Sequence, residues 1–148
     1  MTEKSNRPVS VLFAEDDDDD YLIFSLAVED LSLRITLSRA ENGEILMEIL
    51  GTQIPDFLFL DVLMPSKDGT QCLREIRANP RYDSLPIIAY SSLDQAEDQK
   101  ICFREGANLF VRKAASVFEL KNILLRIFSI DWKSGIYYPP FTQFVVNN

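Results

Sequence analysis

The chain has 148 residues, of which 47% are hydrophobic and 26% are charged, with a formal net charge of −8 and no histidine. These values are typical of one soluble globular domain with a full core. The negative charge argues against a nucleic-acid surface, because phosphates would be repelled, and the lack of histidine excludes Ser–His and Cys–His hydrolases.

The N-terminal residues, the length of the apolar stretches and the cysteines indicate the cellular location of the protein. No apolar stretch reaches the ~18 residues of a membrane span, and residues 1–7 lack the apolar centre of a signal peptide. We therefore expect a cytoplasmic protein with an N-terminal extension at 1–7. Cys72 and Cys102 are too few and too far apart in sequence for a disulfide framework or a zinc site, so we expect buried free thiols.

Short apolar runs alternate along the chain with stretches of helical period. The runs predict strands at Val9–Ala14, Ile35–Ser38, Phe57–Leu60, Ile87–Tyr90 and Leu109–Val111. The helical stretches are Asp19–Leu31, a segment after Asn42-Gly43 that carries Ile45, Leu46, Ile49 and Leu50, then Gly69–Ala78, Asp94–Glu105 with Gly106 as its C-cap, and Ser116–Phe128.

Five such strand–helix units imply an α/β fold with a parallel sheet that is covered on both faces. A domain of this size fits the flavodoxin-like, doubly wound, five-stranded parallel sheet of order 2-1-3-4-5 with five helices. In that order ligands bind beyond the carboxyl ends of the strands, at the switch point between strands 1 and 3.

Polar side chains follow four of the predicted strands at those carboxyl ends: Glu15-Asp16, Asp61, Ser91 and Lys113. Three carboxylates that share a small space repel one another, and a hard divalent cation relieves the repulsion. Oxygen ligands without histidine or cysteine favour Mg²⁺ or Mn²⁺.

An acid after a strand can also be a turn former or a helix N-cap. We assign that role to the four consecutive acids 17–20, which would occupy the first turn of the first helix, where the helix dipole favours negative charge. For Glu15, Asp16 and Asp61 this role would require three coincidences at adjacent strand ends.

Together these motifs resemble the response-regulator receiver domain, the phosphoacceptor half of two-component signalling. The resemblance covers residues 8–128 and leaves 129–148 as an aromatic C-terminal tail. Its motifs are the acidic pair, the segment Asp61-Val62-Leu63-Met64-Pro65 followed by Asp68-Gly69, then Ser91 and Lys113, spaced by 45, 30 and 22 residues (16 to 61, 61 to 91, 91 to 113).

The resemblance implies a role for each matching residue. Asp61 would be phosphorylated, and Lys113 would pair with the phosphoryl group. Ser91 would be the switch hydroxyl and Phe110 the aromatic switch, which lacks a phenol hydroxyl and must act through packing. The implied metal ligands are Asp16 directly, Glu15 directly or through water, Asp61, and the backbone carbonyl of Leu63.

The resemblance also implies partners. The donor would be a sensor histidine kinase or a histidine phosphotransfer protein, since this chain has no histidine. Phosphorylation would repack the surface of helix 4, strand 5 and helix 5, which an unidentified downstream protein would bind; a homodimer formed on phosphorylation is a further candidate. No output domain, nucleic-acid contact or membrane contact is expected. The chain would not be an enzyme beyond its own phosphorylation and dephosphorylation.

Three positions depart from the family pattern. Ala114 stands where the family commonly has a proline after a cis bond, and a cis bond before alanine costs about 3 kcal/mol. We therefore expect either a strained cis Lys113–Ala114 bond or a rerouted trans loop. Leu63 and Leu93 would flank the phosphoryl group, and since apolar side chains cannot orient an attacking water, we expect slow autodephosphorylation.

The tail, which carries Trp132 and Tyr137-Tyr138-Pro139-Pro140-Phe141, leaves two alternatives open. It either packs against its own domain or serves as a dimer arm or partner-docking segment, because exposed aromatic residues mark interfaces.

Other functional classes share parts of the pattern. A haloacid-dehalogenase-type phosphatase needs a second acid where Leu63 stands, and a flavodoxin-like FMN binder needs hydroxyls and amides where this chain has six consecutive acids. A receiver domain that has lost phosphorylation would be a pure interaction module, and the retained acids, Ser91 and Lys113 argue against it.

Overall fold

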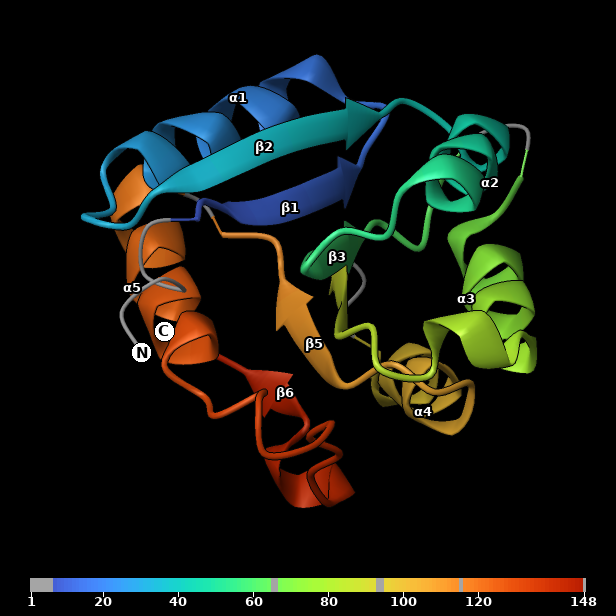
Figure 1. Ribbon diagram of the computed structural model, residues 1–148. Helices are drawn as coiled ribbons and strands as arrows, with labels where there is room; N and C mark the ends of the chain where they lie inside the picture. The colour runs from blue at the N-terminus through green and yellow to red at the C-terminus, as the bar shows by residue number, and fades with distance from the viewer. Residues whose placement is uncertain (1–6, 65–66, 93–94, 115, 148) are drawn as a thin grey trace.

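A parallel β-sheet forms the middle layer of the molecule, with helices on both of its faces (Figure 1). The computed structural model describes residues 7–64, 67–92, 95–114 and 116–147. The strands are β1 (Val9–Ala14), β2 (Ile35–Ala40), β3 (Phe57–Leu60), β4 (Ile87–Ser91), β5 (Leu109–Arg112) and β6 (Val145–Val146). The helices are α1 (Asp18–Glu29), α2 (Gly43–Thr52), α3 (Gly69–Ala78), α4 (Ala96–Arg104) and α5 (Val117–Phe128), with short 3₁₀ turns η2 (Pro80–Tyr82) and η3 (Phe141–Gln143).

Alternation along the strands builds two cores, one on each face of the sheet. Phe57 and Phe59 of β3 pack in the core beneath α1 and α5, whereas Leu58 and Leu60 pack in the core that α2, α3 and α4 cover. Since successive side chains of a strand point to opposite faces, a strand buried on both faces is apolar at every position. This is why β3 reads as an uninterrupted run of four apolar residues.

The helix ends follow capping chemistry that is visible in the sequence. The side chains of Asp17, Asn42 and Ser116 accept hydrogen bonds from the backbone N–H groups of Asp20, Ile45 and Glu119 at the starts of α1, α2 and α5. Gly106 follows α4 with a φ of 104°, in the left-handed region that glycine adopts without strain. This confirms the predicted end of the fourth helix.

The predicted order 2-1-3-4-5 is confirmed, and the sheet has one more strand than expected. β6 pairs in parallel with β5, so the full order is β2-β1-β3-β4-β5-β6. Two valines are too few to show a strand period, and for this reason the sequence predicted five strands. Smaller differences concern bounds: β2 extends to Ala40, and α1 ends at Glu29.

The C-terminal tail packs against its own domain, which is the first of the two alternatives. The Trp132 indole N–H donates to the Ile127 carbonyl over 3.0 Å, and its ring lies edge-on to Phe57 with ring centroids 5.7 Å apart. Phe144 is fully buried. Cys72 and Cys102 are buried free thiols, as expected.

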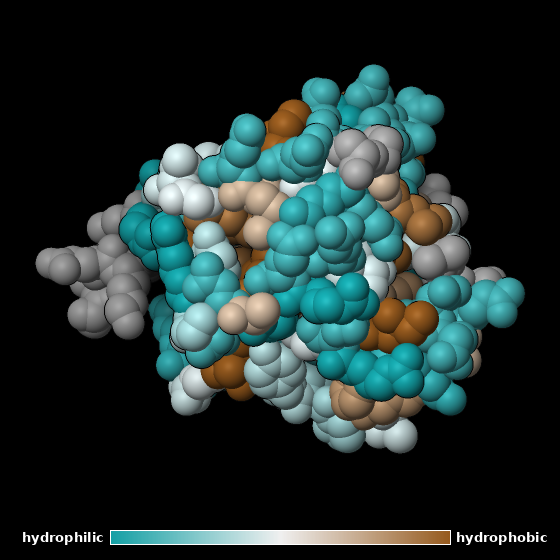
Figure 2. Space-filling model, turned by 90° about the vertical axis from the view of Figure 1, so that its right-hand side faces the viewer, coloured by the Kyte–Doolittle hydropathy of each residue, from teal (hydrophilic) through white to brown (hydrophobic). Residues whose placement is uncertain are grey.

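Two further observations describe the exterior. The face formed by α2, α3 and α4 is mostly hydrophilic, with hydrophobic residues in separate small areas (Figure 2). Within the described residues, every helix is too short or too polar to cross a membrane.

Candidate functional site

The carboxyl ends of β1, β3, β4 and β5 meet at one edge of the sheet. Ala14 pairs with Leu60, and Leu60 pairs with Ala89, so the residues that follow these strands emerge side by side. The backbone N–H of Asp61 still donates to the Ala14 carbonyl over 3.0 Å, which extends the ladder to the first residue beyond β3. The topology therefore brings the predicted site residues to one place.

Three carboxylates converge at this edge. One oxygen atom each from Glu15, Asp16 and Asp61 lie within 4.8 Å of one another. Glu15 is 0% and Asp61 3% exposed, whereas Asp16 is exposed to solvent. This set of hard oxygen ligands, partly buried and open on one side, fits a divalent metal site.

Burial and like charge act together on Glu15. Desolvation of its carboxyl group, the hydrogen bond to Asp61 and the Asp61 charge raise its pKa from 4.5 to about 8, although Lys113 acts in the opposite direction. In the metal-free protein the surroundings of Glu15 therefore favour its protonated form well above the pH at which a solvent-exposed glutamate ionises. A carboxyl group that is held neutral in this way is one that a nearby cation would ionise.

Lys113 contacts three carboxylates at once. Its Nζ lies 2.7 Å from Asp20 Oδ2, 2.9 Å from Glu15 Oε1 and 3.2 Å from Asp61 Oδ2. Burial alone would lower the pKa of Lys113, but the hydrogen bonds to Asp20 and Glu15 and the charge of Asp61 raise it above its usual value. The ammonium group thus stays charged and partly compensates the acids around it.

The backbone at Lys113 takes one of the two predicted forms. Among the described residues there is no cis peptide bond, so the Lys113–Ala114 bond is trans. The Lys113 N–H donates to the Ser91 carbonyl over 2.9 Å, which holds the start of the loop against the end of β4. The trans route therefore still delivers the ammonium group to Asp61.

Ser91, Phe110 and Leu63 lie around this cluster. Ser91 is the last residue of β4 and is fully buried, and Phe110 is a buried residue of β5 on the α4 side of the sheet. The Leu63 N–H donates to Asp61 Oδ1 over 3.0 Å, and the Leu63 side chain is 51% exposed. The role of the Leu63 carbonyl stays a prediction, and Leu93 lies outside the described residues.

The close approach of α3 explains the glycine in the Asp68-Gly69 motif. A Cβ atom at Gly69 would lie 2.3 Å from the Asp61 carbonyl oxygen and 2.6 Å from Val62 Cα. Real side chains do not tolerate such distances to backbone atoms, so only glycine lets α3 begin here. The motif thus lets the first residue of α3 lie directly against the backbone of Asp61.

Two site residues were not predicted as such. Asp20 was assigned to the first turn of a helix, which is correct, but its carboxylate also contacts Lys113. Arg39 of β2 donates from Nε to the Glu15 carbonyl over 3.0 Å and pairs through Nη1 with Asp18 over 2.9 Å. A signal for Asp20 existed, because the first turn of α1 begins at the same edge of the sheet. An arginine in an edge strand gives no such signal.

The doubly wound sheet and its acidic carboxyl edge define a domain of the flavodoxin-like class with a receiver-type site. A sequence model of the family described as "Response regulator receiver domain" matches residues 11–125. The chain belongs to the response regulator receiver domain family.

Individual relatives agree with this assignment. Response regulator Rcp1 of Synechocystis sp. is 23% identical over 94% of this chain and 99% of its own length. An uncharacterized 14.6 kDa protein of Leptolyngbya boryana is 29% identical over 76% of this chain and 84% of that protein. Sensor histidine kinase CheAY of Helicobacter pylori is 29% identical over 88% of this chain but only 16% of the kinase.

Solved structures share the fold. The Mn²⁺-bound form of Rcp1 has a TM-score of 0.74 at 22% identity and covers 90% of this chain and all of its own. A putative response regulator of Chloroflexus aurantiacus has a TM-score of 0.74 at 26% identity and covers 84% of this chain and all of its own.

Proposed function

We propose that this chain is a phosphoacceptor of two-component signalling, in which Asp61 takes a phosphoryl group from a histidine of a partner protein. The partner is a sensor histidine kinase or a histidine phosphotransfer protein in the cytoplasm, and the chain catalyses nothing besides its own phosphorylation and dephosphorylation. The observation that carries the proposal is the setting of Asp61, beside two other acids and 3.2 Å from a lysine ammonium group.

The donors around Asp61 orient its carboxylate for transfer. Leu63 N–H contacts Oδ1 and Lys113 Nζ contacts Oδ2, so the carboxylate plane is fixed before a donor arrives. An Asp61 oxygen would form the new O–P bond while the N–P bond of the partner's phosphohistidine breaks. The electron pair of that bond stays on the imidazole, which then takes up a proton.

Charge neutralisation is the main requirement of this transfer, because the phosphoryl oxygens arrive among existing carboxylates. Glu15, Asp16, Asp61 and the Leu63 carbonyl would hold Mg²⁺ (or Mn²⁺), which when bound neutralises charge on the phosphoryl oxygens. The family likeness and the chemistry of these oxygen ligands support this cofactor. Lys113 would supply the remaining positive charge.

Phosphorylation would then change the packing around β5. The group adds roughly two negative charges and strong acceptor oxygens at Asp61. Lys113 would turn from the carboxylates to the new oxygens, and the Ser91 hydroxyl would turn toward them as well. Phe110, on the neighbouring strand, would move into the space that Ser91 leaves, so a local charge biases a two-state element.

Beryllofluoride, a mimic of the phosphoryl group, tests the proposal without a kinase. Calorimetry with Mg²⁺ should show one bound beryllofluoride per wild-type chain, and Asp61→Asn should abolish binding. Asp83→Asn, the same change at an exposed acid after η2, is the matched control and should bind as wild type does. Binding to Asp61→Asn at wild-type affinity, or no binding to wild type, would refute the proposal.

A further inference from the structure

The surface that phosphorylation is expected to switch is covered by the chain's own C-terminal arm, residues 137–147. In Figure 1 the arm lies along β5, on the side of the sheet opposite to β2, with β6 beside β5 and η3 toward α4. The β5 edge, which would otherwise end the sheet, is therefore paired within the chain.

Hydrogen bonds from backbone and side-chain donors hold the arm along its length. The Phe110 N–H donates to the Phe144 carbonyl over 2.9 Å, and β6 continues the register with Phe110 opposite Val145. Asn108, immediately before β5, donates from Nδ2 to the Tyr137 carbonyl over 2.8 Å. At the far end Arg126 of α5 donates to the Asn147 carbonyl.

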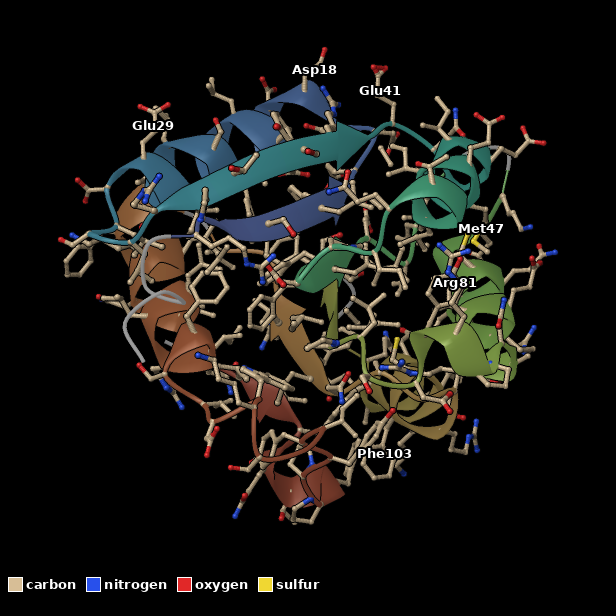
Figure 3. All side chains as sticks on the ribbon, viewed as in Figure 1. Asp18, Glu29, Glu41, Met47, Arg81 and Phe103 are labelled. Atoms are coloured by element: carbon tan, nitrogen blue, oxygen red, sulfur yellow. The ribbon has the colours of Figure 1, made fainter. Side chains whose placement is uncertain are left out.

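Aromatic packing connects the arm directly to the predicted switch residue. The Phe144 ring is fully buried, with its centroid 6.3 Å from that of Phe110 and 5.2 Å from that of Phe103. Phe141 adds a second contact to Phe103, at 5.4 Å. Figure 3 shows Phe103 on α4 beside the arm. Phe110 is thus in contact with the arm through both its backbone and its ring.

The arm is attached less tightly than the core. β6 is only two residues long, and a cavity of about 440 Å³ remains between the arm and α5, lined among others by Ile127, Ile130 and Tyr137. A segment with few inter-strand hydrogen bonds and an open space beneath it has a lower free energy of local unfolding than the strands of the core have.

We propose that the β5 edge is the regulated interaction surface of this chain, and that the arm is its internal occupant, released when Asp61 is phosphorylated. This inference rests on the proposed function. If the Phe110 ring moves toward Ser91, the Phe144 ring loses a packing partner, which weakens docking of the arm and leaves its backbone bond to Phe110 with less support. The released edge presents unpaired backbone groups, which a partner segment in extended conformation can pair.

Linkage fixes the sign of the effect. If phosphorylation weakens docking of the arm, then weakening the arm must favour binding at Asp61 by the same factor. Such couplings are typically 5- to 150-fold. The three clustered carboxylates and Lys113 lie outside residues 137–147, so a change in affinity caused by a substitution in the arm does not come from the loss of one of these groups.

The first experiment compares beryllofluoride affinity, in the presence of Mg²⁺, between the full-length wild type and Phe144→Ala. We expect Phe144→Ala to bind at least about fivefold more tightly. Phe118→Ala, which removes a phenylalanine of α5 that is 70% exposed, is the matched control and should bind as wild type does. Equal or weaker binding by a folded Phe144→Ala protein, while wild type binds, would overturn the inference and leave the proposed function standing.

A second measurement uses the unaltered chain and does not depend on how Phe144→Ala folds. Hydrogen exchange at the Phe110 amide, which the Phe144 carbonyl protects, should become faster when beryllofluoride and Mg²⁺ are added. The amide of Leu58, which donates to the Pro86 carbonyl within the central sheet, should not change. Slower or unchanged exchange at Phe110 in protein that binds beryllofluoride would also overturn the inference. No binding by wild type would remove both proposals together.

Discussion

The Asp20 side chain should weaken binding of a phosphoryl group or its mimic at Asp61, because Asp20 and that group compete for the ammonium group of Lys113. The Lys113 ammonium group donates hydrogen bonds to Asp20 Oδ2 over 2.7 Å and to Asp61 Oδ2 over 3.2 Å, while Glu15 Oε1 lies 2.9 Å from its Nζ, so the Asp20 contact is the shortest. A phosphoryl group or its mimic must therefore take Lys113 from one of its present partners. Asp20→Asn keeps a side-chain acceptor of similar shape but removes the charge.

The size of the effect follows from the kind of bond that is given up. Hydrogen bonds to a charged group contribute roughly 1.5–3 kcal/mol and neutral ones roughly 0.5–1.5 kcal/mol. Since the side chains of Asp20 and Lys113 are 31% and 16% exposed, solvent screening places the difference at about 1 kcal/mol. This corresponds to about fivefold tighter binding of beryllofluoride by Asp20→Asn.

Calorimetric titration with beryllofluoride, at fixed Mg²⁺ and moderate salt, measures this difference. Asp19→Asn makes the same change one residue earlier, at an exposed position of α1, and should shift affinity much less. Asp20→Glu, which restores the charge, should return the affinity toward that of wild type. Weaker binding by Asp20→Asn, or an equal gain in Asp19→Asn, would refute the competition between Asp20 and the phosphoryl group.

Three further outcomes are expected. The raised pKa of Glu15 means that the folded, metal-free protein holds a proton between pH 4.5 and 8 that the unfolded chain has lost, so the free energy of unfolding should fall as pH rises through this window. Urea unfolding in the presence of a chelator measures this fall, and Glu15→Gln should make the unfolding midpoint less dependent on pH. A pH dependence equal to that of wild type would contradict this. Leu63→Asn and Leu93→Glu should shorten the lifetime of the phosphorylated protein, measured by mass spectrometry, and a decay rate unchanged from wild type in both variants would defeat the idea of slow autodephosphorylation. Arg77 donates to three carbonyls and an amide oxygen at 2.8–2.9 Å, so Arg77→Lys should lower the free energy of unfolding by about 2–4 kcal/mol, whereas exposed Arg81→Lys should not.

The strands and the acidic edge were predictable because their signals are local. β3 is apolar at four consecutive positions since both faces of the sheet are covered, and Asp61 follows it directly. The order of the strands then follows from the alternation of strands and helices, and it brings Glu15, Asp61 and Lys113 together without any further information. For the same reason the predicted metal ligands with described side chains lie within reach of one another.

What the sequence did not reveal depends on contacts between distant segments. β6 is two valines whose pairing partner is β5, more than thirty residues earlier, and no period marks it. Asp20 already had a sufficient local explanation at the start of α1, so its second contact remained hidden. Arg77 looks like a surface residue of α3, yet its guanidinium group binds carbonyl groups of η2, of the segment between η2 and β4, and of the α4–β5 loop. Such contacts arise only when the chain is folded.

Phosphorylation of Asp61 itself is the most direct test of the account. Wild-type protein incubated with acetyl phosphate and Mg²⁺ should gain the mass of one phosphoryl group, and peptide mapping should place it at Asp61. The gain should vanish with a chelator and in Asp61→Asn. A phosphoryl group on another residue, or no gain under conditions in which the folded protein binds Mg²⁺, would contradict the central claim.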